Sequence, residues 1–391
     1  MKIKSIKQIR SLEGKRVLLR LDLNVPIRRN KVVELYKLNM ALDTIKYLQA
    51  KDAKIIIISH LGRPKGQRDK TYSLEPVAVA LEKIMQTKIK FSKQIIGQGI
   101  VKKTKSLKNK EILLLENLRF EAGEKENSIE FAKSLAELAD VYVNDAFAVS
   151  HRSQASVDKI KKYLPSYGGL LLEEEINNLS LVFKPKKPFL AVIGGAKIST
   201  KIKLLENLSK SADKILIGGA LANTLYLALG NEVGKSLVDD DSLVWAKSFM
   251  KQKRLKDKIK LPSDFLVENA KKEVVLKKAK NINKSDRIYD IGPDSILEFS
   301  KEIKKAHTLI WNGPLGMFEK KKFKQGTMSI ARSLALQSKK EAICIVGGGE
   351  TVEALSVLNY REYINWISTG GGAMLAFLAK ENMPGLKGLI K

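Results

Sequence analysis

The sequence predicts an α/β fold divided into two domains. Strand-like and helix-like segments alternate from one end of the chain to the other. A length of 391 residues is too great for one compact core and suits two domains. Apolar runs also break into glycine-rich turns ahead of helix-like segments, as in residues 343–351, ICIVGGGET. A buried strand that ends in this way presents backbone N–H groups to an anion.

In the first half, each predicted strand ends in polar residues. These strands are expected at 15–26, 53–63, 111–120 and 140–152. Amphipathic helices are expected at 38–51 and 128–138. Because ligands of open α/β sheets lie beyond the carboxyl ends of the strands, the four strand ends should share one crevice.

The strand ends would bring cations and hydrogen-bonding groups to that crevice: Asp22, Asn24, His60, Arg63, Arg119, His151 and Arg152. The planar guanidinium fork matches phosphate or carboxylate, so several arginines suit a small, multiply charged anion. Any one arginine could instead cap its own loop, and His60 could be a core histidine bonded to backbone.

The second half repeats the strand-to-turn pattern after a predicted division of the chain. Residues 163–169, YLPSYGG, favour a hinge, and a helix at 170–183 should follow. Glycine-rich turns then follow strands at 189–197, 343–351 and 366–373. These three turns could direct amides and helix N-termini at one anion, for which a polyphosphate is the simplest interpretation. Further strand–turn pairs are predicted at 214–224, 287–295 and 308–319.

Two apparent motifs are rejected. Residues 230–236, GNEVGKS, resemble a P-loop but place three residues between the glycines where the template has four. Residues 347–352, GGGETV, lack the last glycine of the dinucleotide fingerprint. A nicotinamide-dependent enzyme is therefore not supported.

Composition bears on localisation and cofactors. The N-terminus, MKIKSIKQIR, lacks the apolar core of a signal peptide, and the apolar runs are too short to span a bilayer. We therefore expect a cytoplasmic protein that does not bind membranes. The single cysteine, Cys344, lies in an apolar run and is expected in the core. No His, Cys, Asp or Glu cluster has the spacing of a zinc or iron centre.

Charge is unbalanced, with 71 Lys and Arg against 42 Asp and Glu and a formal net charge of +29. The lysines cluster, with little aromatic interleaving, at 102–105, 251–260, 271–280 and 320–324. Solvated helix faces or loops account for such runs. Nonspecific attraction of RNA, or steering of an anionic metabolite, is the functional alternative.

A series of motifs spans most of the chain in a fixed order: LDLNVP, SHLGRPKG, LLENLRF, VNDAF with SHR, GGAKIS with a second lysine at Lys201, WNGPLGMFE, VGGGET and STGGGA. Together, from residue 15 to residue 385, they resemble the phosphoglycerate kinase family. Any one of the motifs is modest evidence, whereas the ordered set leaves little room for chance.

The resemblance implies two Rossmann-like domains with mainly parallel sheets, joined by a hinge and an interdomain helix. Residues 1–166 would bind triose phosphate, and residues 184–378 would bind the nucleotide with Mg²⁺. Residues 167–183 would form the hinge and the interdomain helix, and residues 379–391 would return to the N-terminal domain. A monomer is expected on the same grounds.

The implied reaction is reversible phosphoryl transfer between 1,3-bisphosphoglycerate and Mg-ADP, which gives 3-phosphoglycerate and Mg-ATP in glycolysis and gluconeogenesis. A carboxyl group with a pKa of roughly 3.5 is ionised at neutral pH, so the acceptor needs no general base. Cations and amides can then suffice to position the reactants for direct in-line transfer on domain closure.

The resemblance also assigns roles on the triose side. The non-transferring phosphate would be held by His60, Arg63, Arg119 and Arg152. The hydroxyl and carboxyl end of the substrate would be oriented by Asp22 and Asn24. Lys37 would lie near the transferring phosphoryl group.

On the nucleotide side, Lys197 would reach the transferring phosphoryl oxygens and Lys201 the nucleotide phosphates. The alternative is that these two lysines have no functional role. They would then be solvated charges, one turn apart on an exposed helix. Lys37, Lys197, Gly348 and Gly371 would form the catalytic set. Glu350 would hold Mg²⁺. The remaining nucleotide contacts are assigned to Gly195, Gly219, Gly292, Asn312, Pro314, Glu319, Gly348, Gly349 and Thr351.

Some positions depart from the family pattern. Lys37 replaces an arginine and loses its bidentate fork. Thr200 and Glu350 each replace an aspartate, and residues 153–154 read SQ where the family has a small residue and a histidine. Misplacing a catalytic group by about 1 Å can cost on the order of a hundredfold in rate. We therefore expect a working but slow kinase. The alternatives are a weakened paralogue that only binds nucleotide or triose phosphate, and a basic polyanion or RNA binder on the same fold.

Overall fold

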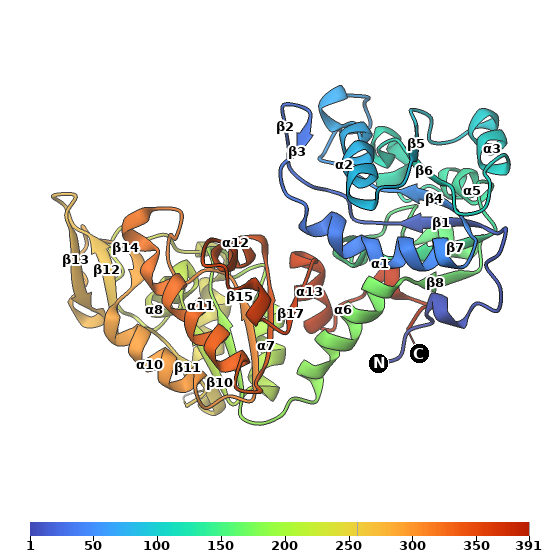
Figure 1. Cartoon of the computed structure of the whole chain (residues 1–391). Helices are drawn as coiled ribbons and strands as arrows, with labels where there is room; N and C mark the ends of the chain where they lie inside the picture. Colours follow the sequence, from blue (N-terminus) through green and yellow to red (C-terminus); the bar gives the residue numbers. More distant parts are fainter. Residues whose placement is uncertain (256, 391) are drawn as a thin grey trace. The chain divides into compact units, whose positions relative to one another are not determined.

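The computed structural model describes residues 1–255 and 257–390 (Figure 1). These residues form two compact units, one made of Met1–Asn177 with residues 381–390 and the other of residues between Asn178 and Lys380. The first division falls inside helix α6 (Leu170–Ser180). Each unit contains one six-stranded sheet, which confirms the predicted α/β class with mainly parallel strands.

The sheet of the first unit is wholly parallel, in the order β5-β6-β4-β1-β7-β8. Its strands are β1 (Arg16–Arg20), β4 (Lys54–Ile58), β5 (Ile89–Ser92), β6 (Ile112–Leu115), β7 (Val141–Asn144) and β8 (Ser166–Gly168). A two-stranded hairpin, β2 (Ile27–Arg28) with β3 (Lys31–Val32), follows β1. The four strands predicted from sequence are therefore neighbours, β6-β4-β1-β7, and their carboxyl ends lie along one edge.

Helices cover both faces of this sheet (Figure 1). They are α1 (Tyr36–Ala50), α2 (Glu75–Met85), α3 (Gln98–Lys105), α4 (Ala122–Lys125) and α5 (Ile129–Ala136). Val17 and Leu19 belong to one apolar cluster, whereas Leu18 between them belongs to the opposite one. This alternation is the two-residue period of a strand buried on both faces, and it explains why β1 and β4 read as continuous apolar runs.

The two ends of the chain meet in the first unit. The backbone N–H of Lys4 donates to the carbonyl of Leu389 at 2.7 Å. Gly385 N–H donates to the Ser150 carbonyl at 2.8 Å, and the Asn144 amide donates to the Gly385 carbonyl at 3.0 Å. The C-terminal residues are thus hydrogen-bonded to the segment that follows β7.

The second unit also has a parallel sheet, in the order β11-β10-β9-β15-β16-β17. Its strands are β9 (Phe189–Ile193), β10 (Lys214–Ile217), β11 (Ile259–Lys260), β15 (Thr308–Asn312), β16 (Ile343–Gly347) and β17 (Trp366–Ile367). The helices are α7 (Ile202–Ser211), α8 (Gly219–Ala228), α9 (Leu243–Met250), α10 (Pro293–Ile303), α11 (Gln325–Ser338), α12 (Gly349–Val357) and α13 (Gly371–Leu378). Cys344 in β16 is fully buried, as predicted.

A separate antiparallel sheet, β13-β12-β14, was not anticipated from the sequence. It comprises β12 (Asp264–Glu268), β13 (Val274–Lys278) and β14 (Arg287–Ile291). The predicted strand at 287–295 therefore belongs to this small sheet rather than to the parallel one. Among the described residues, no helix is both long and apolar enough to cross a membrane.

Candidate active site

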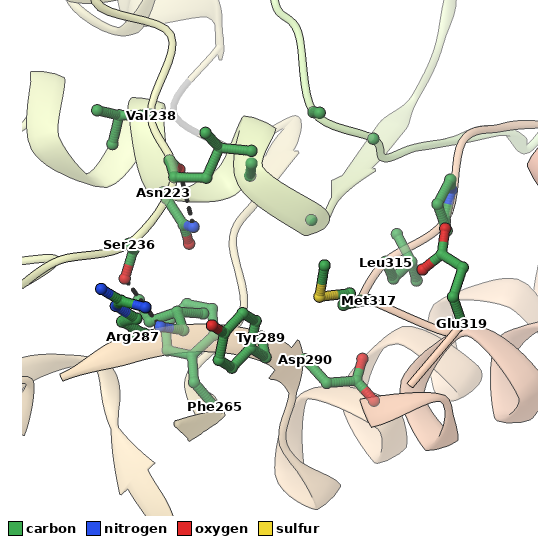
Figure 2. A pocket seen from close by; sticks show the side chains of 18 of the residues that line it. Asn223, Ser236, Val238, Phe265, Arg287, Tyr289, Asp290, Leu315, Met317 and Glu319 are labelled. Carbon is green, nitrogen blue, oxygen red and sulfur yellow. Dashed lines mark hydrogen bonds between the residues drawn. The ribbon is translucent and has the colours of Figure 1, made fainter. Parts of the chain in front are cut away.

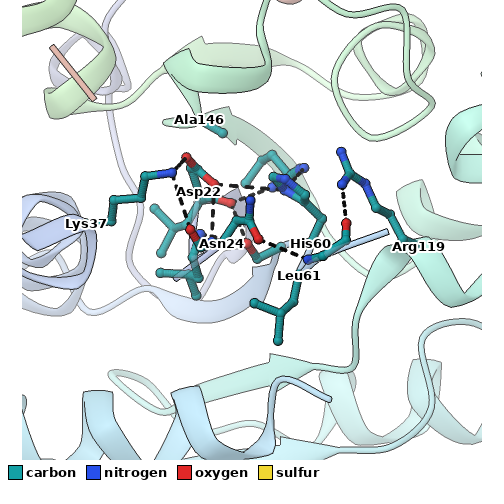
Figure 3. Close-up of polar contacts among 12 residues, drawn as sticks. Asp22, Asn24, Lys37, His60, Leu61, Arg119 and Ala146 are labelled. Carbon is teal, nitrogen blue, oxygen red and sulfur yellow. Dashed lines mark hydrogen bonds and ion pairs between the residues drawn. The ribbon is translucent and has the colours of Figure 1, made fainter. Parts of the chain in front are cut away.

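An ion pair lies at the carboxyl end of β1 (Figure 3). The Lys37 ammonium, at the start of α1, lies 2.7 Å from Asp22 Oδ2 and donates more weakly to the Asn24 carbonyl at 3.4 Å. Asp22 is nearly buried, whereas Lys37 keeps 29% of its side chain exposed. The carboxylate therefore fixes a lysine whose ammonium remains accessible to a ligand.

The loop after β4 is tied to this pair and to the loop after β6. Gly62 N–H donates to Asn24 Oδ1 at 3.0 Å, and the Arg119 guanidinium donates to the Gly62 carbonyl. Asn117 accepts hydrogen bonds from the N–H groups of Leu61 and Arg119, both at 3.1 Å. Asn24, Asn117 and Arg119 thus hold three strand ends in one arrangement.

His60 is almost fully buried, and the Arg20 guanidinium Nη2 lies 3.2 Å from its Nδ1. Burial lowers the pKa of His60 well below its usual range, and repulsion from Arg20, Arg119, Lys37 and Arg152 adds to the effect. The imidazole is therefore neutral at physiological pH. A guanidinium can only donate, so Nδ1 accepts and the ring proton belongs on Nε2.

Behind Arg20 lies a buried polar network that sequence analysis missed. Arg20 Nε donates to Ser156 Oγ at 3.0 Å, and that hydroxyl donates to Glu124 Oε1 at 2.6 Å. Ser156 N–H donates to the same carboxylate at 2.9 Å, and Tyr142 donates to the Ser156 carbonyl at 2.7 Å. An arginine inside an apolar strand, RVLLR, was the available signal, since buried charge requires partners.

The remaining predicted cations lie around the same strand ends. Arg63 is exposed, and Arg152 is half-buried with its Nε donating to His151 Nε2 at 3.3 Å. Burial lowers the pKa of Arg119 to about 10, and repulsion from Arg152 and Arg20 contributes to this shift. Burial likewise lowers the pKa of Arg152, with repulsion from Arg63. Such shifts mark clustered positive charge that the protein's own carboxylates leave largely uncompensated, which favours an anionic ligand.

A pocket of about 560 Å³ lies in the second unit (Figure 2). One part of its lining contains turn glycines and carboxylates, including Gly195, Gly219, Pro314, Glu319 and Glu350. All five were predicted to contact nucleotide. The other part is mainly apolar and was not predicted, because most of its residues come from the antiparallel sheet and the segment that follows α8: Leu237, Val238, Phe265, Ile288, Tyr289 and Met317.

Lys201 does not stand on an exposed helix beside Lys197, so the alternative in which both lysines are solvated charges does not fit Lys201. Helix α7 begins only at Ile202, so Lys197 lies in the preceding turn and is exposed, whereas Lys201 is 7% exposed. The Lys201 ammonium donates to the Gly194 carbonyl. Burial lowers its pKa to about 8, which attraction to Glu350 partly offsets. A Cβ atom added to Gly195 would lie 2.8 Å from Lys201 Nζ, so the glycine leaves room for the ammonium beneath the turn.

The starts of α12 and α13 are close together. A Cβ atom added to Gly371 would lie 3.6 Å from Gly348 Cα, which is van der Waals contact distance, so the two turns are neighbours. Asn312 Nδ2 donates to the Gly347 carbonyl at 2.8 Å, and Gly313 N–H donates to Thr351 Oγ1 at 2.8 Å. These two hydrogen bonds join the end of β15 to the turn that ends β16 and to α12, which begins at Gly349.

Gly292 and Glu350 differ in their relation to the pocket. Gly292 precedes α10, and an added Cβ would lie 2.4 Å from Asp264 Cγ; it does not line the described pocket. Glu350, in the first turn of α12, does line it. Within the described residues, no group of three or more His, Cys, Asp or Glu side chains could hold a metal ion alone. A single carboxylate matches Mg²⁺ that is bound mainly through ligand phosphates and water.

Comparisons with known proteins identify the family of this chain. The family model described as Phosphoglycerate kinase matches residues 6–381. A "Phosphoglycerate kinase" of Coprothermobacter proteolyticus is 43% identical, with 100% of this chain and 99% of the relative covered. Among solved structures, phosphoglycerate kinase from Coxiella burnetii is similar with a TM-score of 0.87, 37% identity and 98% coverage of both chains. The Pyrococcus horikoshii enzyme is similar with a TM-score of 0.86, 32% identity and coverage of 99% and 98%. The chain therefore belongs to the phosphoglycerate kinase family, whose members are kinases that transfer phosphate to 3-phosphoglycerate.

Proposed function

We propose that the cations at the strand ends of the first unit bind the triose phosphate. The observation that carries this assignment is that His60, Arg119 and Arg152 follow neighbouring strands of one parallel sheet. Burial lowers the pKa of all three, and repulsion among the cations, which an anionic phosphate would relieve, adds to the shift. Arg63 is exposed beside them and completes the phosphate-binding group. His60 would donate from Nε2 to a phosphate oxygen.

The Lys37–Asp22 pair would face the reacting end of this substrate. The carboxylate of 3-phosphoglycerate is ionised at neutral pH and would attack without a general base. Asp22 and Asn24 would orient the hydroxyl and carboxyl groups, and the Lys37 ammonium would neutralise charge on the transferring phosphoryl group. Lysine supplies charge here without the planar fork of arginine.

The pocket of the second unit would bind ATP or ADP. Amides near Gly195, Gly219, Gly348 and Gly349 would approach the phosphates, where the N-termini of α8 and α12 favour negative charge. The exposed Lys197 would reach the transferring phosphoryl oxygens, the Lys201 ammonium would contact the nucleotide phosphates, and Gly371 would line the same turn as Gly348. Glu319 and Asn312 would bind ribose and phosphate, next to Pro314 and Thr351.

Mg²⁺ would be held by the Glu350 carboxylate together with nucleotide phosphates. When bound, Mg²⁺ screens phosphate charge and orients the polyphosphate. The chain's own contribution is to place Glu350 in the first turn of α12, where the helix N-terminus also attracts the phosphates. Thr200, which is exposed after the GGAK turn, has no carboxylate. Glu350 is therefore the proposed metal-binding residue.

We infer direct in-line phosphoryl transfer, in a cytoplasmic and monomeric protein. Purified protein given 3-phosphoglycerate and Mg-ATP should form the acyl phosphate, which coupled reduction detects, and a chiral γ-phosphate should invert. Lys197→Ala should abolish most of the turnover while nucleotide binding persists. Saturable Mg-nucleotide binding without any product would instead indicate a binding paralogue, and RNA retention at physiological salt a polyanion binder.

A further inference from the structure

Two backbone segments of the second unit are joined by a hydrogen bond beside the pocket. One is the turn between β9 and α7, residues 194–201, which carries Lys197. The other is the segment 235–240, which lines the pocket with Ser236 and Val238 among others (Figure 2). A ligand in the pocket therefore contacts the second segment directly, and any effect on Lys197 from this contact must pass between the two segments.

The position of the Lys197 ammonium depends on the backbone of its turn. Lys197 is exposed, and a flexible four-carbon stem carries its charge. The start of the turn is fixed, because Gly195 N–H donates to the Pro314 carbonyl at 2.8 Å. After Lys197, Ile198 is fully buried in the core, whereas the next two residues are exposed. The exposed side of the turn can therefore be held only by a group from outside it.

Asp239 supplies that group. Ser199 N–H donates to Asp239 Oδ2 at 3.0 Å, although the two residues are 40 positions apart in the sequence. This hydrogen bond is the main cause that lowers the pKa of Asp239, and hydrogen bonds from Ser242, the Ser199 hydroxyl and Ile198 N–H add to it. The carboxylate is ionised at neutral pH, so its hydrogen bonds to the turn are charge-assisted.

Asp239 is itself fixed by helix α8. Its N–H donates to Thr224 Oγ1 at 3.0 Å, and Thr224 is fully buried. The residues on both sides of it, Val238 and Asp240, line the pocket, whereas the Asp239 carboxylate bonds the Lys197 turn. One short segment thus contacts the pocket and holds the turn.

We propose that Asp239 is a positioning residue that holds the Lys197 turn against the pocket-lining segment, so that nucleotide contact with this segment keeps Lys197 in place for phosphoryl transfer. The inference rests on the proposed roles of Lys197 and of the nucleotide pocket. Asp239 touches neither substrate, and it acts through the backbone of residues 198–199.

The test compares turnover with nucleotide affinity in full-length variants. In Asp239→Ala, kcat should fall about tenfold, because a small shift of the turn misplaces the Lys197 ammonium. The Kd of Mg-ADP, measured by titration calorimetry, should remain close to that of wild type, since Asp239 is outside the pocket lining. In a Lys197→Ala background, Asp239→Ala should cause no further loss of kcat, because the group that it positions is already absent.

Two variants make the result specific. Asp239→Asn keeps an acceptor for Ser199 N–H without the charge, so it should give an intermediate kcat. Asp241→Ala removes the same charge from an exposed position two residues further along, and it should leave kcat unchanged. Removing a negative charge near bound phosphates favours their binding, so a loss of kcat in Asp239→Ala alone does not come from charge.

Wild-type kcat in Asp239→Ala would overturn the inference. So would an undiminished further loss of kcat in the Lys197→Ala background, or a rise in Kd that accounts for the whole loss of turnover. If Lys197→Ala leaves too little turnover to measure, the comparison of kcat with Kd decides. If Asp239→Ala does not fold, Asp239→Asn takes its place.

Failure of this inference can be told apart from failure of the proposed function. Full turnover in Lys197→Ala would show that the proposed role of Lys197 is wrong. A large loss in Lys197→Ala with none in Asp239→Ala would leave the role of Lys197 intact and remove Asp239 alone.

Discussion

The Arg20 guanidinium lies 3.2 Å from Nδ1 of His60. This contact lies in the part of the first unit where the cationic side chains proposed to bind substrate gather. Both side chains are buried, and Arg20 is held from behind by Ser156. Because Arg20 can only donate, it sets the imidazole tautomer and leaves Nε2–H as the hydrogen-bond donor. Arg20, which is not among the proposed substrate contacts, thereby determines which nitrogen of His60 could donate to a phosphate.

This relationship predicts the behaviour of His60 in solution. Nitrogen NMR of the imidazoles should show His60 as the neutral Nε2–H tautomer at pH 6.5, the ordinary pKa of histidine, because burial and neighbouring cations lower its pKa well below that value. Only three histidines occur in the chain, so His60→Gln identifies the signal. Protonation of His60 above pH 6, or an Nδ1–H signal, would contradict the assigned geometry.

Arg119→Lys should weaken the triose phosphate site. Lysine keeps the charge but cannot both bond the Gly62 carbonyl and present a planar fork to phosphate. We expect KM for 3-phosphoglycerate to rise about tenfold or more, with KM for ATP unchanged. Arg68→Lys is the matched control, because Arg68 is exposed and bonds the Lys93 carbonyl and Glu121. Equal effects of the two substitutions would argue against the assignment.

Substitutions of Lys37 test whether lysine limits the rate. Lys37→Gln removes the charge and leaves Asp22 nearly buried without its 2.7 Å partner, so kcat/KM should fall on the order of a hundredfold. Lys37→Arg adds a fork that can pair with Asp22 and a phosphoryl oxygen together, and it should preserve or raise turnover. Loss of activity in Lys37→Arg would show that the site is built for the smaller ammonium.

Glu350→Gln should raise the Mg²⁺ concentration needed for half-maximal turnover about tenfold, because the amide binds the cation less strongly than the carboxylate. Titration of Mg²⁺ at fixed, saturating nucleotide measures this change. Glu353→Gln, on the same helix and outside the pocket lining, serves as the control. An unchanged Mg²⁺ dependence would remove Glu350 from the metal site.

Asp145 should make the protein's stability depend on pH. Burial raises its pKa to about 7, although Leu172 N–H donates to Oδ1 at 2.9 Å. The folded protein therefore binds a proton that the unfolded chain releases near pH 4, so this group's contribution to stability falls as pH rises from about 4 through about 7. Asparagine cannot ionise, so Asp145→Asn lacks this pH-dependent contribution to stability. Relative to wild type, it should gain about 1 kcal/mol or more in unfolding free energy between pH 5 and pH 8, measured by urea denaturation. If the difference in unfolding free energy between Asp145→Asn and wild type stays constant with pH, the pKa of Asp145 is not raised.

Much of this architecture can be predicted from residues whose roles are local. A strand that ends in glycines and a following helix appear in the sequence as an apolar run, a turn and a periodic segment, as in β16 and α12. Arg119 and His60 could be located because polar residues after buried strands fall at one sheet edge. Their mutual contacts could not, since these depend on Asn24 and Asn117, which pair residues far apart in sequence.

Burial of polar groups was the main property that the sequence did not reveal. Lys201 reads as a solvated lysine, yet the turn before it lets the ammonium reach the Gly194 carbonyl. Arg20 reads as a strand terminus, yet three hydrogen-bonding partners surround its guanidinium. The antiparallel sheet was missed because only β14 was predicted as a strand, whereas β12 and β13, which complete the sheet, were not.

The hydrogen bonds between Gly385 and the Ser150 and Asn144 groups join segments that are far apart in the sequence. Lys161 also donates to the carbonyls of Pro384 and Lys387, so residues 384–387 brace the segment after β7, which carries Arg152. A nascent chain can pair β1 through β8 early, yet this brace can form only after residue 387 has been synthesised. A truncation that removes the brace should therefore impair the proposed triose phosphate site before it affects ATP binding.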